Sequence, residues 1–589
     1  MEDLDNTETG LAEAIMDGRK CQNTKQQYKR KYEHFRKWMK EKYPMCFLED
    51  GLTVDLGRIE KSHFLDFFGH ICKKKSSSGG YLSPIQYQSF QHVSGYKSAI
   101  KDHFGNMDHN LKDEIEKFLK NFFGGYMRKI ANLKQDGEMS IVEGKMPLSF
   151  RGYKFLAEKA IMNRDGHDNG LNSRDEKLAI FSHIFLLLCW NLIARCVSVG
   201  TLMLNHISWD NDSLVIVFPS HKGDKDGKKA IPKHVYANTK EPSICPILSL
   251  AIYLFTKGYD REGSKTTLFP GDAESKFSKW LRKICEANSE TLRSQGVDIS
   301  MIGTHSFRKG VATFLSGTPG GPTAIAIYLR AGWSLGPVQS RYILEGEGGD
   351  QMCGRAATGL PITDVTFANL PAHILTLESG LTTAVWDDIL PGYTTYYPLN
   401  FREVVPYLLA SLVYHRSYLL AIQDKHPQHP LFLQRVWTSG ILERLQDKVG
   451  AGCNRNPVST MTATGVPPHL VLANQIVDMQ KGMDVIRGEV ISKLDGLPEA
   501  LKQSMLQNFN INGTVPITHL QVVEMMEKLQ SSIQTTIQAA LIQNQSIATS
   551  AQVPTDMSST GSETEIPSYR TWTWGSKIHP IPEGFRFPK

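Results

Sequence analysis

The chain has 589 residues, of which 41% are hydrophobic and 21% charged, and its formal net charge is +6. This composition, with a mean hydropathy of −0.28, is typical of an ordinary folded soluble protein and argues against collagen-like, mucin-like and wholly disordered classes. A chain of this length holds roughly three to five folded units of about 150 residues each. The longest apolar run, 184–194, is interrupted by Asn191 and is too short to cross a bilayer, so we expect no membrane partner.

The N-terminus begins Met-Glu-Asp-Leu-Asp, without a positive-then-apolar leader, so we expect no secretion. Nine cysteines are scattered along the chain with no CxxC or Cys/His ligand spacing. This usage predicts reduced thiols in the cytosol or nucleus rather than disulfides or structural zinc.

Residues 1–19 are predicted to be a flexible tail. Between Arg19 and Tyr43 the chain carries ten basic residues against two glutamates, an excess that suits a phosphate backbone. The aromatic and methionine side chains Tyr28, Tyr32, Phe35 and Met39 recur at 4-3-4 spacing, which indicates one buried helix face. We therefore expect a helical DNA-binding domain over 20–135, although a solvated helix without a ligand fits the charge alone about equally well. The candidate phosphate contacts are Lys29, Arg30, Arg36, Lys37, Lys73, Lys74 and Lys97.

A polar linker, 132–144, leads into a second predicted domain over 145–355. Its pattern is helical except at 213–219 and 229–236, where two β-rich segments flank a Gly/Asp/Lys turn. The predicted fold class is mainly α with a small antiparallel β-sheet in this domain. The predicted helices are 149–162, 174–195, 245–257, 273–287 and 305–316.

The C-terminal third is predicted to hold further helices. Residues 361–450 predict a helical accessory domain, and 468–545 carry apolar residues in heptad spacing over two short helices. These two helices either fold on each other or mediate oligomerisation. Residues 546–566 predict a linker, and 567–589 form an aromatic and proline-rich segment.

One constellation of residues points to chemistry on a phosphodiester. His305 and Arg308 lie one helical turn apart, so an imidazole and a guanidinium can address one phosphate together. The sequence Arg-Ala-Gly-Trp ends at Trp333, and Tyr342 follows nine residues later. This arrangement resembles the signature of tyrosine recombinases. Residues 186–195, ending in Arg195, look like the first-arginine helix of that family, and Lys222 falls in the β-turn where the family places its catalytic lysine.

The resemblance implies a tyrosine-recombinase fold, a helical core-binding domain plus a mixed catalytic domain, here with an additional C-terminal helical region. It implies that Tyr342 attacks DNA to form a covalent 3′-phosphotyrosine. The roles follow from chemistry: Arg195 and Arg308 neutralise the transition state, His305 is a base or hydrogen-bond donor, Lys222 protonates the leaving oxygen, and Trp333 donates its indole N–H. We expect no metal, ATP or other cofactor.

Several points stay open in this assignment. Lys225, Lys228 and Lys229 lie in the same turn as Lys222 and compete with it. Tyr328 competes with Tyr342, but its apolar helical neighbours predict a packing role. Many members of the family carry an acidic residue where this chain has Ser198, which puts the rate and the rigidity of the site in doubt more than the reaction type.

The last residues, 569–589, look like the start of the DNA-binding domain of a yeast glycolytic-gene activator and of Crypton-type transposons, although a disordered aromatic tail fits them too. We therefore expect a nuclear DNA transposase that binds double-stranded transposon ends and target DNA as a dimer or tetramer. The alternatives are a monomer like type IB topoisomerases, a catalytically silent domesticated protein that binds centromeres or promoters, and a structural helical scaffold.

Overall fold

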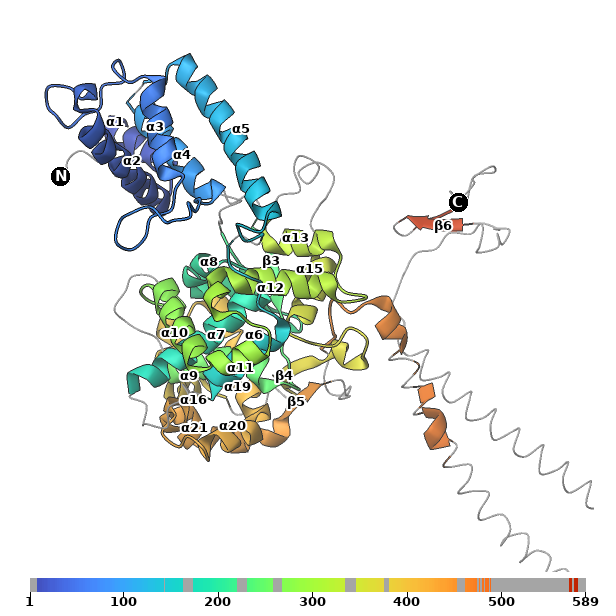
Figure 1. Cartoon of the computed structure of the whole chain (residues 1–589). Helices are drawn as coiled ribbons and strands as arrows, with labels where there is room; N and C mark the ends of the chain where they lie inside the picture. Colours follow the sequence, from blue (N-terminus) through green and yellow to red (C-terminus); the bar gives the residue numbers. More distant parts are fainter. Residues whose placement is uncertain are drawn as a thin grey trace, which may run out of the picture. The chain divides into compact units, whose positions relative to one another are not determined.

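A computed structural model gives the structure of the chain as two units, residues 1–478 and 479–589, which are treated separately (Figure 1). The described residues are 8–107, 109–141, 144–162, 173–219, 230–257, 267–333, 346–375, 381–452, 461–473, 476, 479–480, 482–486, 488, 571–574 and 577–580.

Of the five helices near the N-terminus, the last four share one hydrophobic core. Helix α2 buries Tyr32, Phe35, Trp38 and Met39 in this core, largely the face that the aromatic spacing predicts. The helices are α1 (Glu8–Asp17), α2 (Gln22–Lys42), α3 (Lys61–Ile71), α4 (Phe90–Gly105) and α5 (Asp113–Gln135).

Within the predicted flexible tail, 1–19, residues 8–17 form helix α1. It buries none of its side chains, so no buried apolar stripe announces it in the sequence. The residues after it are anchored, because the Arg19 side chain binds Asn106 and the Lys20 side chain binds Asp102 on α4.

A second, larger core extends from Leu148 to Leu470. Helix α7 crosses it, and every residue from Ala179 to Ala194 is buried, which explains why this helix is apolar on all sides. The helices of the first part of this core are α6 (Phe150–Ile161), α7 (Ser173–Asn191), α8 (Cys196–Gly200), α9 (Pro246–Lys257), α10 (Ala273–Ala287), α11 (Ser289–Ser294), α12 (Thr304–Gly317), α13 (Ala324–Ala331) and α15 (Glu347–Ala357).

The strands form small antiparallel sheets, so the predicted fold class, mainly α with a small antiparallel sheet, is confirmed. Strands β1 (Ile207–Asp210), β2 (Ser213–Val217) and β3 (Pro232–Val235) make the sheet of the larger core, with Ile216 opposite Lys233. The other pairs are β4 (Leu370–Ile374) with β5 (Val449–Gly452), and β6 (Thr571–Trp574) with β7 (Lys577–Pro580) in the second unit.

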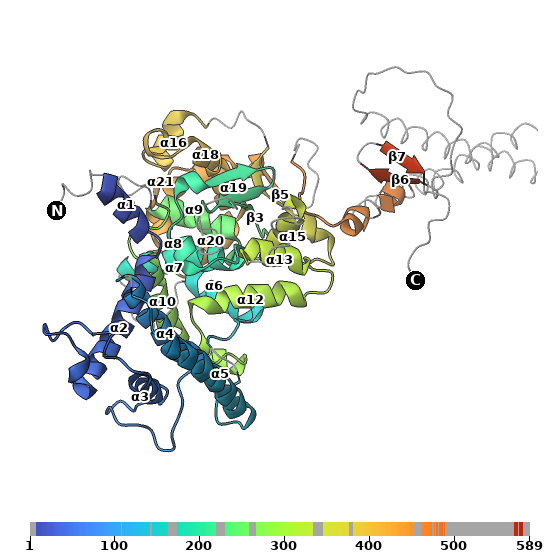
Figure 2. The same ribbon diagram turned by 90° about the horizontal axis from the view of Figure 1, so that it is seen from above.

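The buried apolar side chains of the predicted accessory region, 361–450, belong to the same core as α7. Helix α19 (Val405–Tyr414) is nearly all apolar and lies beside α9 (Figure 2). It also packs against β4. The other helices of this part are α16 (Thr383–Ile389), α17 (Tyr393–Tyr396), α18 (Leu399–Arg402), α20 (Arg416–Gln423), α21 (Arg435–Thr438) and α22 (Ile441–Arg444).

Short 3₁₀ turns connect the elements at Pro44–Cys46, Leu204–His206, Pro242–Ile244, Ile299–Met301, Val365–Ala368, Pro430–Leu433 and Gln446–Lys448. Most of the predicted amphipathic region, 468–545, and the predicted linker, 546–566, lie outside the described residues. In the described part of the chain, no helix combines the length and the apolar character that a membrane crossing requires.

Candidate active site

A strained turn presents Arg195 between two helices. Helix α7 ends at Asn191, and Ile193 then adopts a left-handed backbone with φ of 48°, which is rare for a β-branched residue. Arg195 is the extended N-cap residue of α8 and is half-buried. No hydrogen bond or ion pair joins its guanidinium to another residue of the described chain.

Arg308 is close enough to Arg195 to feel its charge. It comes from α12, only 8% of it is exposed, and its Nη2 donates to the carbonyl oxygen of Ala331. Burial and, after it, the charge of Arg195 lower the pKa of Arg308 to about 10. Among the described residues no carboxylate forms an ion pair with either guanidinium. Two neighbouring positive charges without an acid suit an anion with several acceptor oxygens, and we call this pair of guanidiniums the Arg195–Arg308 pocket.

Trp333 lies close to Arg308. Gly332 ends α13 with a φ of 63°, a left-handed conformation that glycine adopts without strain. The chain turns back there, and the Trp333 ring comes to lie 5.4 Å from the Arg308 guanidinium carbon.

Tyr328 departs from its predicted packing role in part. Its ring contacts that of Trp333 edge to face, with 5.1 Å between the ring centroids, but 40% of the residue is exposed. The buried face of α13 consists of Ala326, Ile327, Arg330 and Ala331, and Tyr328 lies outside that face.

A fully buried network lies beside the arginine pair. Arg330 forms an ion pair with Asp350 of α15, with 2.5 Å between Nη1 and Oδ1. It also donates to the carbonyl oxygens of Asn191 (2.8 Å) and His234 (2.8 Å). The Oδ2 of Asp350 accepts the backbone N–H of His234 (2.8 Å) and lies 2.9 Å from its Nδ1. Although burial opposes it, the charge of Arg330 and the hydrogen bonds from His234 hold the pKa of Asp350 below its usual range. Arg330 therefore ties α13 to α15, β3 and the end of α7.

Lys233 is a member of the site that the sequence analysis missed. It is 7% exposed on β3, and its Nζ donates to the carbonyl oxygen of Leu192, three residues before Arg195. Burial lowers the pKa of Lys233 to about 7, and the positive charges of Arg330, Arg308 and Arg195 act in the same direction. The negative charge of Asp350 has the opposite effect and raises this pKa. In the structure Lys233 lies opposite Ile216, which is fully buried. No alternation of buried and exposed residues marks Lys233 in the sequence, because His234 and Val235 beside it are buried too.

For the other predicted catalytic residues, His305, Lys222 and Tyr342, the described contacts show no link to Arg195 or Arg308. His305 lies in the first turn of α12 with its side chain exposed, and no described hydrogen bond or ring contact joins it to Arg308. Lys222 and Tyr342 lie outside the described residues. The helices on either side of the Tyr342 segment, α13 and α15, are linked by the ion pair between Arg330 and Asp350.

The predicted phosphate-contacting side chains differ in their exposure to solvent and in whether they already contact another side chain. Lys29, Arg30 and Lys37 are exposed on α2, whereas Arg36 binds Glu33 at 2.9 Å. Lys73 lies over the Tyr81 ring at 5.2 Å and Lys97 over Phe123 at 4.6 Å, and Lys74 is half-buried.

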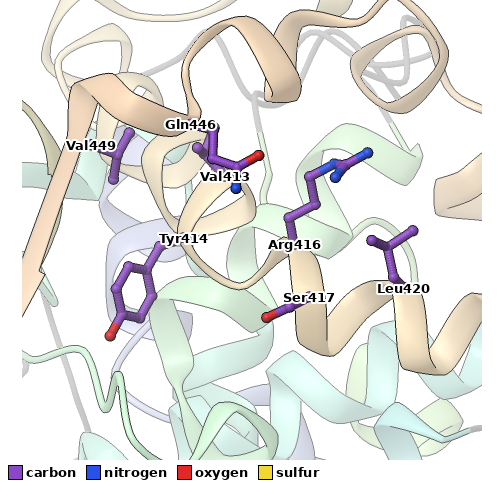
Figure 3. A pocket seen from close by; sticks show the side chains of 7 residues that line it. All are labelled: Val413, Tyr414, Arg416, Ser417, Leu420, Gln446 and Val449. Atoms are coloured by element: carbon purple, nitrogen blue, oxygen red, sulfur yellow. The ribbon is translucent and has the colours of Figure 1, made fainter.

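A small hollow lies elsewhere in this unit, between α19, α20 and the segment before β5 (Figure 3). Its one charged residue, Arg416, already binds Glu443. None of the six predicted catalytic residues lines this hollow, whose walls are Val413, Tyr414, Arg416, Ser417, Leu420, Gln446 and Val449.

Comparison with known proteins gives structural similarities of low score. No protein-family model matches the sequence, and no curated protein sequence matches it. The chain is similar to XerH site-specific recombinase bound to difH substrate, with 13% identity and a TM-score of 0.30 over 53% of this chain and 73% of the other. It is also similar to FLP recombinase in a Holliday junction complex, with 11% identity and a TM-score of 0.30 over 62% and 87%. A third similarity is to Ndc10, described as a platform for inner kinetochore assembly in budding yeast, with 11% identity and a TM-score of 0.24 over 76% and 97%.

Proposed function

We propose that this protein is a tyrosine recombinase that cleaves and rejoins DNA through a covalent 3′-phosphotyrosine. One observation carries the proposal: Arg308 is largely buried and feels the charge of Arg195, and no carboxylate of the described residues forms an ion pair with either guanidinium. Like charges brought together out of water destabilise a fold, so such an arrangement calls for an anionic ligand. A phosphodiester supplies two non-bridging oxygens for two guanidinium forks.

The proposed reaction assigns a role to each group. The Tyr342 hydroxyl attacks the phosphorus and the 5′-oxygen leaves, while Arg195 and Arg308 bind the charge that develops on the non-bridging oxygens. His305 assists proton removal from Tyr342 or donates a hydrogen bond, and Lys222 protonates the leaving oxygen. Trp333, next to Arg308, completes the pocket with its ring and indole N–H. The phosphotyrosine conserves the energy of the broken bond, so rejoining needs neither ATP nor a metal.

The finer assignment is a Crypton-type DNA transposase in the nucleus. The exposed cations of α2 would hold the phosphate backbone of double-stranded transposon ends and target DNA. Exposed apolar residues at Leu472, Ile476, Met479 and Met483 support pairing of copies through the 468–545 region, as a synapsis of two ends would require. The 567–589 segment would add a further DNA contact.

The decisive experiment is capture of the covalent intermediate. The full chain is incubated with nicked duplexes that span candidate transposon ends, and the products are separated on a denaturing gel. The wild-type protein should form a protein–DNA adduct, and the Tyr342→Phe variant should form none. Tyr328→Phe is the matched control, because Tyr328 is a partly exposed tyrosine near the same pocket, and it should retain the adduct.

Other outcomes would change the assignment. An adduct that persists in Tyr342→Phe but disappears in Tyr328→Phe would move the nucleophile to Tyr328. Tight duplex binding with no adduct from any duplex would identify a catalytically silent DNA-binding protein. Relaxation of any supercoiled plasmid by the monomer would indicate a topoisomerase rather than a recombinase.

A further inference from the structure

Lys233 lies among more cations than the nearby carboxylate can balance. Arg195, Arg308 and Arg330 act on it from the α7–α8 turn, α12 and α13, and Asp350 acts on it from α15. Asp350 is already bonded to Arg330 and to both nitrogens of His234 that face it. The Asp350 carboxylate therefore binds Arg330 and His234 and forms no ion pair with Lys233.

The hydrogen bonds around Lys233 also favour the neutral amine over the ammonium. An ammonium group has three N–H donors, whereas a neutral amine has two donors and a lone pair. Only one acceptor, the carbonyl oxygen of Leu192, binds Nζ within the described chain, and the Phe218 ring lies 5.0 Å from it. An ammonium in this place would have N–H groups without acceptors, which is costly for a group 7% exposed.

We propose that Lys233 is a third, proton-linked cation of the Arg195–Arg308 pocket, a neutral amine while the pocket is empty and an ammonium once a phosphodiester occupies it. The inference rests on the proposed function, because it requires a phosphodiester to bind between the two arginines. The bound phosphate offsets the arginine charges and brings acceptor oxygens close to Nζ. The lone pair of Lys233 then takes one proton from solvent, and no other bond is made or broken.

Burial already lowers the pKa of Lys233 to about 7, so the amine is largely unprotonated in weakly alkaline solution. A negative charge in the pocket raises that pKa, and binding between pH 7.5 and 8.5 should therefore take up about one proton. The other groups that face Lys233 do not supply this proton. Arginines stay charged in this range, the pKa of Asp350 is lowered, and burial raises that of Cys353, which faces Arg330 and Asp350, to about 12. His234, which binds Asp350, and the exposed His305 are common to every variant compared below.

The test counts protons taken up when the full chain binds DNA. The Tyr342→Phe variant serves as the parent so that no strand is cut, and it is titrated calorimetrically with a nicked duplex at pH 7.8 in buffers of low and high ionisation enthalpy. The parent should take up about one proton more than the same protein with Lys233→Met. Lys159→Met, which removes a half-buried lysine lying over the Phe155 ring, should leave the uptake unchanged.

Affinity gives a second, independent measurement. Between pH 7.5 and 8.5 the affinity of the parent should fall up to about tenfold more than that of Lys233→Met, because each proton bound contributes a factor of ten per pH unit. Equal proton uptake in the two proteins would overturn the inference. So would no uptake by the parent, a result that needs no folded Lys233 variant.

Failure of the inference and failure of the proposed function give different results. If Arg308→Met binds the duplex as tightly as the parent, the arginine pocket does not hold DNA and the proposed function fails. If Arg308→Met weakens binding but proton uptake does not depend on Lys233, only the role of Lys233 is rejected.

Discussion

Two cationic regions of this chain differ in how their charges are balanced. On the α2 surface the cations are solvated and several are paired, as Arg36 is with Glu33 and Lys25 with Asp17. In the Arg195–Arg308 pocket the two guanidiniums are partly or largely buried beside each other with no described acid. Exposed ion pairs change stability little, whereas buried like charges oppose folding. The buried arginine pair is therefore a place where like charges oppose folding, and a bound anion would offset that repulsion.

Removing the acid that balances the buried cations should have the largest effect on the fold. Asp350→Ala leaves Arg330 buried without its carboxylate, and we expect the free energy of unfolding to fall by about 3–5 kcal/mol. Asp388→Ala breaks an exposed pair with Arg435 and should cost less than about 1 kcal/mol. Denaturant unfolding of the two variants would measure both. Equal losses would show that burial of the ion pair does not set its importance.

Removing a pocket cation should separate activity from stability. Arg308→Met should lower the strand-cleavage rate by about 10²–10³-fold, the usual effect of losing one donor to a developing oxyanion. Its melting temperature should not fall, because the repulsion from Arg195 disappears with the charge. Single-turnover cleavage and thermal unfolding of the same preparation test this together. Loss of both would indicate that Arg308 is mainly structural.

Lys233 should make stability depend on pH in alkaline solution. Its pKa is about 7 in the folded chain and near the usual 10.5 when unfolded, so the unfolded state binds more protons between these values. Stability contributed by the neutral amine is thus present at high pH and lost as the pH falls toward 7. Relative to Lys233→Met, the free energy of unfolding of the wild-type protein should rise from pH 7.5 to 9.5. Its slope against pH should correspond to up to about one proton. Parallel curves for the two proteins would contradict the buried, neutral lysine.

The smallest effect is expected on the α2 surface. Lys29→Ala should weaken binding to all duplex sequences alike and reduce the slope of log affinity against log salt by about 0.9, the loss of one phosphate contact. Arg36→Ala should reduce the slope less, because Arg36 is already engaged by Glu33. Binding titrations across a salt series provide the measurement. A change of sequence preference in Lys29→Ala would mean that this lysine contacts bases.

Local patterns in the sequence predicted much of the fold because they depend on near neighbours. The apolar run before Arg195 is a buried helix, and the β-rich segment after it is strand β2. Pairing between distant segments leaves no such local pattern. Strands β4 and β5 are about 80 residues apart, and the sequence of neither strand indicates that the two pair. Nor does any local pattern indicate that residues 361–450 join the main core.

Arg195 and Arg308 were singled out because their spacing resembles a known signature, and in the structure Arg308 feels the charge of Arg195 and lies 5.4 Å from the Trp333 ring. Lys233 was missed because the Gly/Asp/Lys composition of 221–228 favoured Lys222 and its neighbours, while a lysine in a buried strand is uncommon. The role of Arg330 was also hidden, since a motif does not distinguish an arginine that binds ligand from one that holds helices together.

The continuous core from Leu148 to Leu470 has a consequence for synthesis of the protein. By residue 357 a ribosome has made every described element around the arginine pocket, yet α9 still lacks α19, which packs against it. About sixty further residues must emerge before that face is covered. We therefore expect nascent chains released before residue 414 to expose apolar surface and recruit chaperones, and the pocket to become usable only late in translation.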